Sequence, residues 1–141
     1  MNDFFVLNNG NDETVVNEQF AGYVVFYKKS KEEKIAEIQS NLLNKLIQNA
    51  LKLNLDNFLF IDLNTQKIRL ASLRKSIKIE KCFLFGVQEA EIGTNIVIPN
   101  YQLILVADIQ FLKVDAPEKL EQNKPLKNQL WEQLQISFKL V

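Results

Sequence analysis

The sequence predicts a three-layer α/β/α sandwich, in which a mostly parallel central sheet of about four strands lies between helices. Two observations support this fold class. The run from Ala21 to Tyr27 is uncharged and shows no alternation of polar and apolar residues, as expected of a strand covered on both faces. A long amphipathic segment follows almost at once. A buried strand followed by a helix is how a layered α/β domain begins.

Length and composition agree with one soluble domain. The chain has 141 residues, of which 47% are hydrophobic and 24% charged, and a domain of this size buries roughly two-thirds of its unfolded surface. Lys and Arg number 17, as do Asp and Glu, so the net charge is zero. Nucleic-acid-binding domains usually carry a basic excess, so this balance argues against direct nucleic-acid binding.

Residues 1–19 are polar and rich in asparagine, and we treat them as an N-terminal arm that precedes a single domain at 20–141. The arm holds one apolar cluster, followed by the turn-forming residues 8–12. Two interpretations remain open for this cluster. It is either an edge strand or flap packed on the core, or a docking peptide that becomes ordered on a partner. The residues concerned are Phe4, Phe5, Val6 and Leu7.

The helix that follows the first strand has a recognisable start. Ser30 and Glu33 have the spacing of a capping box, in which each side chain bonds the other residue's backbone amide. The helical pattern continues to about Lys52, with a wide apolar stripe that core packing explains. That stripe consists of Ile35, Ile38, Leu42, Leu46 and Ala50, with Leu43 and Ile47 beside them.

Two further apolar runs predict buried strands, at 57–61 and 81–85. Between them, Asn64 or Thr65 is expected to cap a short helix that ends near residue 73. Cys82 lies inside the second run, which predicts a small buried hydrophobic side chain and not a reactive thiol. Gly86 ends that run, at a position suited to a sharp turn or a close approach.

The C-terminal third contains a fourth predicted strand, at 101–107. Residues 108–115 keep an apolar spacing that fits either a continued strand or a loop crossing the sheet. Pro117 is expected to open a short helix at 118–122, and Pro125 lies in the first turn of the last helix. One broad face of that helix carries Leu126, Leu130, Trp131, Leu134 and Phe138.

The chemistry that the chain lacks argues against an enzyme. It has no histidine, one cysteine and no glycine-rich phosphate-binding motif. We therefore expect no catalytic residues, no metal and no cofactor. The remaining enzymatic possibility is a small-molecule site built on acidic residues at strand ends, Asp62 or Glu89, with Asp108 as a further strand-end carboxylate. The lone cysteine suits a reducing compartment. With no signal peptide and no apolar run long enough to span a bilayer, we expect a cytoplasmic protein.

The most basic part of the chain follows the second predicted strand. Either it is a solvated surface, or it is a contact surface for nucleic acid. The residues concerned are Arg69, Arg74, Lys75 and Lys78.

The segment from Asn123 to Gln135 carries a resemblance. It begins with an asparagine, continues with a basic residue and then has a Leu-Trp pair followed by another leucine. In this chain those residues are Asn123, Lys127, Leu130, Trp131 and Leu134. The pattern resembles the C-terminal helix motif of the psi subunit family of bacterial DNA polymerase III, which has a uracil-DNA glycosylase-like fold. The order of the predicted elements over residues 20 to 138 matches as well.

The resemblance implies a non-catalytic adaptor subunit. Active glycosylases of this fold use an Asp or Asn loop after the first strand and a later histidine. Here Lys28, Lys29 and Ser30 stand after that strand, and histidine is absent. Psi-like subunits join clamp-loader ATPase subunits to an accessory subunit that contacts single-stranded-DNA-binding protein. An N-terminal peptide makes the loader contact, and Phe4 to Leu7 occupy a similar place in this chain.

In such a protein Asn123 would serve as a helix cap and Trp131 as a core residue. The alternative is a degenerate glycosylase-like protein that binds single-stranded nucleic acid through the basic segment at 69–78.

Overall fold

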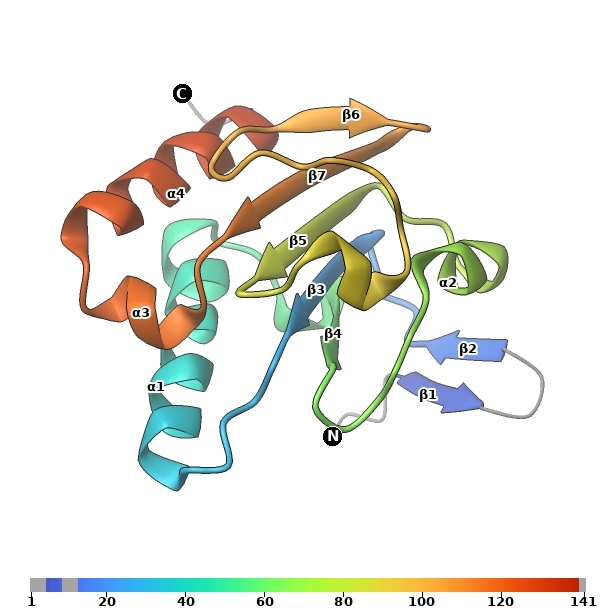
Figure 1. Cartoon of the computed structure of the whole chain (residues 1–141), viewed down its shortest axis with the longest axis horizontal. Helices are drawn as coiled ribbons and strands as arrows, with labels where there is room; N and C mark the ends of the chain where they lie inside the picture. Colours follow the sequence, from blue (N-terminus) through green and yellow to red (C-terminus); the bar gives the residue numbers. More distant parts are fainter. Residues whose placement is uncertain (1–4, 9–12, 140–141) are drawn as a thin grey trace.

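The computed structural model describes residues 5–8 and 13–139, and shows an α/β fold built around a five-stranded mixed sheet (Figure 1). The strand order is β4-β3-β5-β7-β6. The first four strands in this order pair in parallel, and β6 pairs antiparallel with β7. The bounds are β3 (Tyr23–Tyr27), β4 (Phe58–Asp62), β5 (Lys81–Phe85), β6 (Ile104–Val106) and β7 (Ile109–Val114).

The predicted buried strands are confirmed as β3, β4 and β5. In the register of the sheet Val25 lies between Phe60 of β4 and Phe83 of β5. Successive side chains of a strand point to opposite faces, and both faces of β3 meet apolar clusters. Cys82 is fully buried in β5, and this burial raises the pKa of its thiol. The thiol therefore behaves as the small apolar side chain that its surroundings in the sequence predict.

Helices and loops cover both faces of the sheet, but unequally. One face packs against α1 (Glu33–Asn44), its π-helical continuation η1 (Lys45–Ala50), α3 (Pro117–Glu121) and α4 (Lys124–Ser137). The other face packs against the short helix α2 (Leu70–Ser76), the 3₁₀ turn η3 (Glu89–Ile92) and their adjoining loops. A further 3₁₀ turn, η2 (Leu55–Asn57), leads into β4. Figure 1 shows α1, α3 and α4 grouped on one side.

The predicted fourth strand is corrected. The segment at 101–107 forms only the short edge strand β6, whereas residues 109–114, left open between strand and loop, form the fourth parallel strand, β7. Ala107 and Asp108 connect the two strands, with φ angles of 52° and 67°. Positive φ at both central residues is the geometry of a tight hairpin turn. The sheet therefore has five strands where the sequence predicts about four.

The predicted capping box at the start of α1 is wrong. The N-cap residue is Glu32, whose N–H donates to the Ser30 hydroxyl at 3.1 Å. The Ser30 N–H donates instead to Oε1 of the buried Gln39, at 3.0 Å. The Gln39 side chain, from the second turn of the helix, thus accepts the Ser30 N–H hydrogen bond that was predicted for the Glu33 carboxylate.

The helix predicted after Asn64 or Thr65 begins later, at Leu70, and ends at Ser76. Asn64 and Thr65 form a turn held by Asp62. The Asn64 N–H donates to the Asp62 carboxylate at 3.0 Å, and the Thr65 N–H donates to the Asp62 carbonyl at 3.1 Å. Asn64 and Thr65 therefore belong to the turn that follows β4, and neither residue caps a helix.

The N-terminal arm contains a separate antiparallel hairpin of β1 (Phe5–Asn8) and β2 (Glu13–Val16). Val16 packs against the apolar cluster on the α2 face. Of the proposed docking residues, Phe5, Val6 and Leu7 lie in β1, and Phe4 lies outside the described residues.

Candidate protein-binding surfaces

In open α/β sheets, ligands usually bind beyond the carboxyl ends of the strands, where the strand order reverses. Here the reversal falls between β3 and β5. Lys28 and Lys29 follow β3, and Gly86 follows β5. A reaction centre in this fold would be expected at this end of the sheet.

Internal contacts occupy that edge. Lys28 Nζ lies 2.9 Å from the Glu91 carboxylate, which joins the end of β3 to η3. The Gln39 amide group donates to the Lys28 carbonyl at 3.0 Å and to the Glu118 carboxylate at 2.9 Å. A Cβ atom at Gly86 would lie 2.8 Å from the Cβ of Ala116. These contacts join the segment that follows β3 to α1, α3 and η3.

The two carboxylates considered for an enzyme have structural partners. Glu89 accepts the Ile98 N–H at 2.7 Å and pairs with Lys113 at 3.0 Å. The bond from Ile98, together with the Lys113 ammonium group, holds the pKa of Glu89 below its ordinary value. Asp62 accepts the Lys29 N–H at 2.9 Å. Both carboxylates therefore serve to join loops at this edge.

The lowered pKa of Glu89 predicts a pH-dependent contribution to stability. Because the folded protein favours the ionised form, this contribution is complete above the unfolded pKa of about 4.3. It is lost as the pH falls through the folded pKa. We expect Glu89→Gln to lower the free energy of unfolding by about 1–2 kcal/mol at pH 7, with a smaller difference at pH 3. Urea denaturation of both proteins at pH 7 and pH 3 measures this difference in the free energy of unfolding.

The matched control is Glu132→Gln, at an exposed position of α4. Its effect should be small and similar at both pH values, since surface charges contribute little. An equal loss at pH 7 and pH 3 for Glu89→Gln would contradict the assigned role of the carboxylate.

The basic residues lie around α2 and are all exposed. Arg69 precedes the helix, with its guanidinium group close to Gly93. Arg74 donates to the Ala107 carbonyl at 3.4 Å, and Lys75 shares the last turn. Lys78, beyond the helix, lines a different pocket from Arg69. The structure thus spreads these residues along α2 and does not bring them to one pocket.

The residues of the C-terminal motif have mainly structural contacts. Asn123 caps α4 by accepting the Leu126 N–H at 3.1 Å, as expected. Lys127 lies 3.7 Å from Glu121 at the surface. Leu130 is buried, but Trp131 is only partly buried, and packs at the margin of the same cluster. The expected core position of Trp131 is therefore corrected, because the buried face of α4 is centred on Leu130 and Leu134.

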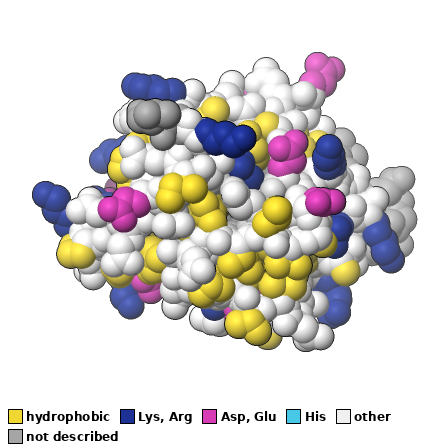
Figure 2. Space-filling view, turned by 90° about the horizontal axis from the view of Figure 1, so that it is seen from above, with side chains coloured by type: hydrophobic (Ala, Val, Ile, Leu, Met, Phe, Trp, Pro, Cys, Tyr) yellow, Lys and Arg dark blue, Asp and Glu magenta, His cyan; other side chains and the backbone are white. Residues whose placement is uncertain are grey.

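An apolar surface lies at the β6 edge of the sheet. Leu105 of β6 is 70% exposed, and Ile136 of α4 is 62% exposed. The two elements are adjacent, since the Leu103 N–H donates to Gln133 of α4 at 3.2 Å. Gln110, which pairs with Leu105, accepts a hydrogen bond from the Ser137 hydroxyl. We call Leu105 and Ile136 with the intervening atoms the β6–α4 surface. Figure 2 views this side of the molecule and shows hydrophobic side chains gathered on it, with many Lys and Arg side chains towards its margins.

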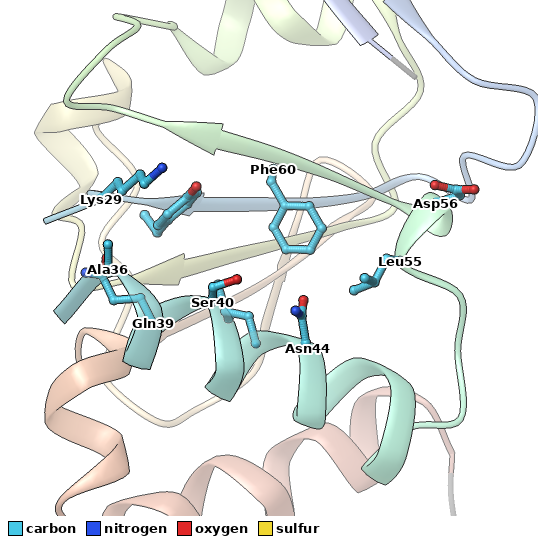
Figure 3. Close-up of a pocket in the computed structure, with 10 residues that line it drawn as sticks. Lys29, Ala36, Gln39, Ser40, Asn44, Leu55, Asp56 and Phe60 are labelled. Carbon is cyan, nitrogen blue, oxygen red and sulfur yellow. The ribbon is translucent and has the colours of Figure 1, made fainter. Parts of the chain in front are cut away.

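A second open surface is a groove between α1 and the edge strand β4 (Figure 3). Its volume is about 560 Å³. Lys29 lies towards one end and Asp56 towards the other, with Phe60 between them (Figure 3). We call it the α1–β4 groove; its walls are Tyr27, Phe60 and Leu55 on the sheet side, and Ala36, Ser40 and Asn44 on the helix side.

These features describe an α/β domain in which polar contacts join the segments beyond the carboxyl ends of the strands, with an exposed apolar surface and a groove elsewhere on the molecule. No group of His, Cys, Asp or Glu within residues 5–8 and 13–139 is placed to hold a metal ion. Over the same ranges, no helix has both the length and the hydrophobicity for crossing a bilayer. No family model, curated protein or solved structure matches the chain.

Proposed function

We propose that the chain is a non-catalytic adaptor resembling the psi subunit of bacterial DNA polymerase III, with a uracil-DNA glycosylase-like fold. In this role it links clamp-loader and accessory replication proteins by protein–protein contacts. The observation that carries the proposal is the β6–α4 surface, where Leu105 and Ile136 expose most of their apolar side chains. Contiguous exposed apolar patches often mark protein–protein contacts.

The arrangement of elements supports the family resemblance. The chain forms β3, α1, β4, α2 and β5 before the closing helix α4, in the order on which the resemblance rests. Between β5 and α4 the structure adds β6, β7 and α3, where the resemblance has a loop. Asn123 begins that helix as its cap. The non-catalytic role rests on the absence of histidine and on Lys28, Lys29 and Ser30, which stand where active glycosylases have their Asp or Asn loop.

The proposal predicts the effect of a double substitution, Leu105→Lys with Ile136→Lys. Two charges on the β6–α4 surface should weaken partner binding at least tenfold, because each ammonium group would lose water on association. Affinity capture from the native cell, followed by mass spectrometry, should recover clamp-loader or other replication proteins with the unchanged chain. The double variant should lose them.

Lys34→Glu is the control, because it changes the charge at an exposed position of α1, which borders β4 at the opposite end of the sheet from β6. Circular dichroism must show that both variants fold. Recovery of no replication protein, or equal recovery by the double variant, contradicts the proposal. If the chain instead binds single-stranded DNA in a way that weakens steeply with salt and with charge reversal at 69–78, the nucleic-acid alternative replaces it.

A further inference from the structure

Along the outer side of β4, several backbone groups have no hydrogen-bond partner among the described residues. β4 is the last strand at its end of the sheet. The Leu63 N–H donates to the Tyr27 carbonyl of β3, and strand residues alternate in direction. The backbone groups of Leu59 and Ile61 therefore also face β3, and those of Phe60 face away from it. No residue among 5–8 and 13–139 takes the Phe60 N–H or carbonyl.

The neighbouring groups define how long this open edge is. The Phe58 N–H is already used, because it donates to the Leu55 carbonyl at the end of η2. The Asp62 carbonyl is used by the N–H groups of Thr65 and Gln66. Within the part of the chain that the structure describes, the outward groups with no partner are the Phe58 carbonyl, both groups of Phe60 and the Asp62 N–H. They form the donor and acceptor sequence that one further strand would pair with.

The α1–β4 groove lies beside this edge, on the face that carries the Phe60 side chain. A strand added to β4 would run about 4.8 Å away. Alternate side chains of that strand would then point towards α1 and into the groove. Phe60 and Leu55 offer apolar contacts there, and Ser40 and Asn44 border them from the helix. The groove therefore accepts an aliphatic side chain next to a polar wall.

Opposite charges mark the two ends of the groove. Asp56 precedes β4 within η2, and Lys29 lies near the carboxyl end of β4, where its N–H donates to Asp62. Figure 3 shows the two side chains at opposite ends of the groove. A complementary segment carries a basic residue at the Asp56 end and an acidic residue at the Lys29 end.

We propose that β4 binds an extended segment of a partner protein as an added strand. The segment inserts an aliphatic side chain into the α1–β4 groove, between a basic and an acidic residue. This inference rests on the proposed adaptor function, because it requires a protein partner, and it adds the kind of segment that the partner would supply. It concerns a surface separate from Leu105 and Ile136, which lie on β6 and α4, so the two surfaces allow two partners to be held together.

The test uses a library of random displayed heptapeptides selected on the full chain. We expect a shared pattern with a basic residue at one end, a central aliphatic residue and an acidic residue at the other end. Hydrogen exchange on the complex with the selected peptide should protect the Phe60 amide. Ser40 is an exposed residue of α1 that lines the groove. The indole of Ser40→Trp should fill the groove and lower the affinity for the selected peptide at least tenfold.

Asn41→Trp is the matched control, since Asn41 is an exposed neighbour outside the groove. It should leave peptide affinity unchanged, as should Leu105→Lys with Ile136→Lys. Selection of no such peptide, an unprotected Phe60 amide, or equal binding by Ser40→Trp overturns the inference. The adaptor proposal is tested separately by capture of replication proteins, so either proposal can fail while the other stands.

Discussion

Replacing Phe26 with alanine is expected to lower the free energy of unfolding by about 3–5 kcal/mol. Phe26 lies in β3, which pairs with β4 on one side and β5 on the other, and its side chain is fully buried. Truncation removes a large apolar side chain from the cluster under α2 and leaves a cavity that the surrounding strands fill only in part. Urea denaturation monitored by far-UV circular dichroism measures the change.

Phe60→Ala is the matched control, since it removes the same atoms from the neighbouring strand. Phe60 is only partly buried, at the α1–β4 groove, so we expect a loss of about 1–2 kcal/mol. Equal losses of free energy for the two variants would contradict the deeper burial assigned to Phe26.

Gly86→Ala is expected to be the second most damaging change. Gly86 has a φ angle of 69°, which costs an L-residue about 1–2 kcal/mol. The new Cβ would also lie 2.8 Å from the Ala116 Cβ and 3.0 Å from its Cα. Relieving that overlap requires a shift of backbone between β7 and α3 and adds about 1–3 kcal/mol. Thermal and urea unfolding of the variant measure the combined loss.

Gly93→Ala separates the two causes. Gly93 also has a φ angle of 69°, but its new Cβ would meet the end of the flexible Arg69 side chain, at 3.0 Å. That side chain can move aside, so only the backbone cost of about 1–2 kcal/mol is expected. Equal losses for the two variants would show that the contact with Ala116 contributes nothing.

The central strands were predictable because burial on both faces removes the alternation of polar residues. The runs at 21–27, 57–61 and 81–85 carry that signal directly. The β6–β7 hairpin was not predictable, because its turn uses Ala107 and Asp108 in place of glycine. Without glycine or asparagine in the turn, residues 101–115 resemble one apolar stretch. The position of the turn is known only from the pairing of β6 with β7 in the structure.

The surfaces were harder to predict than the fold. Ser40 and Asn44 are polar residues on an amphipathic helix, so in the sequence they belong to an ordinary solvent-facing side. Phe60 belongs to an apolar run that indicates burial. That they face each other across an open groove depends on where α1 lies relative to the edge of the sheet. The distance between a helix and a strand cannot be predicted from the local pattern of polar and apolar residues.

The position of α4 has a consequence for the growing chain on the ribosome. Leu130 and Leu134 cover an apolar cluster that includes Phe83 and Leu112, on strands that are synthesised earlier. During translation, α1 and η1 can cover part of that face early, but the part under α4 stays uncovered until residues 124–137 are free to fold. Exposed apolar strands at this stage favour aggregation, so a chaperone would matter most in the interval before α4 packs.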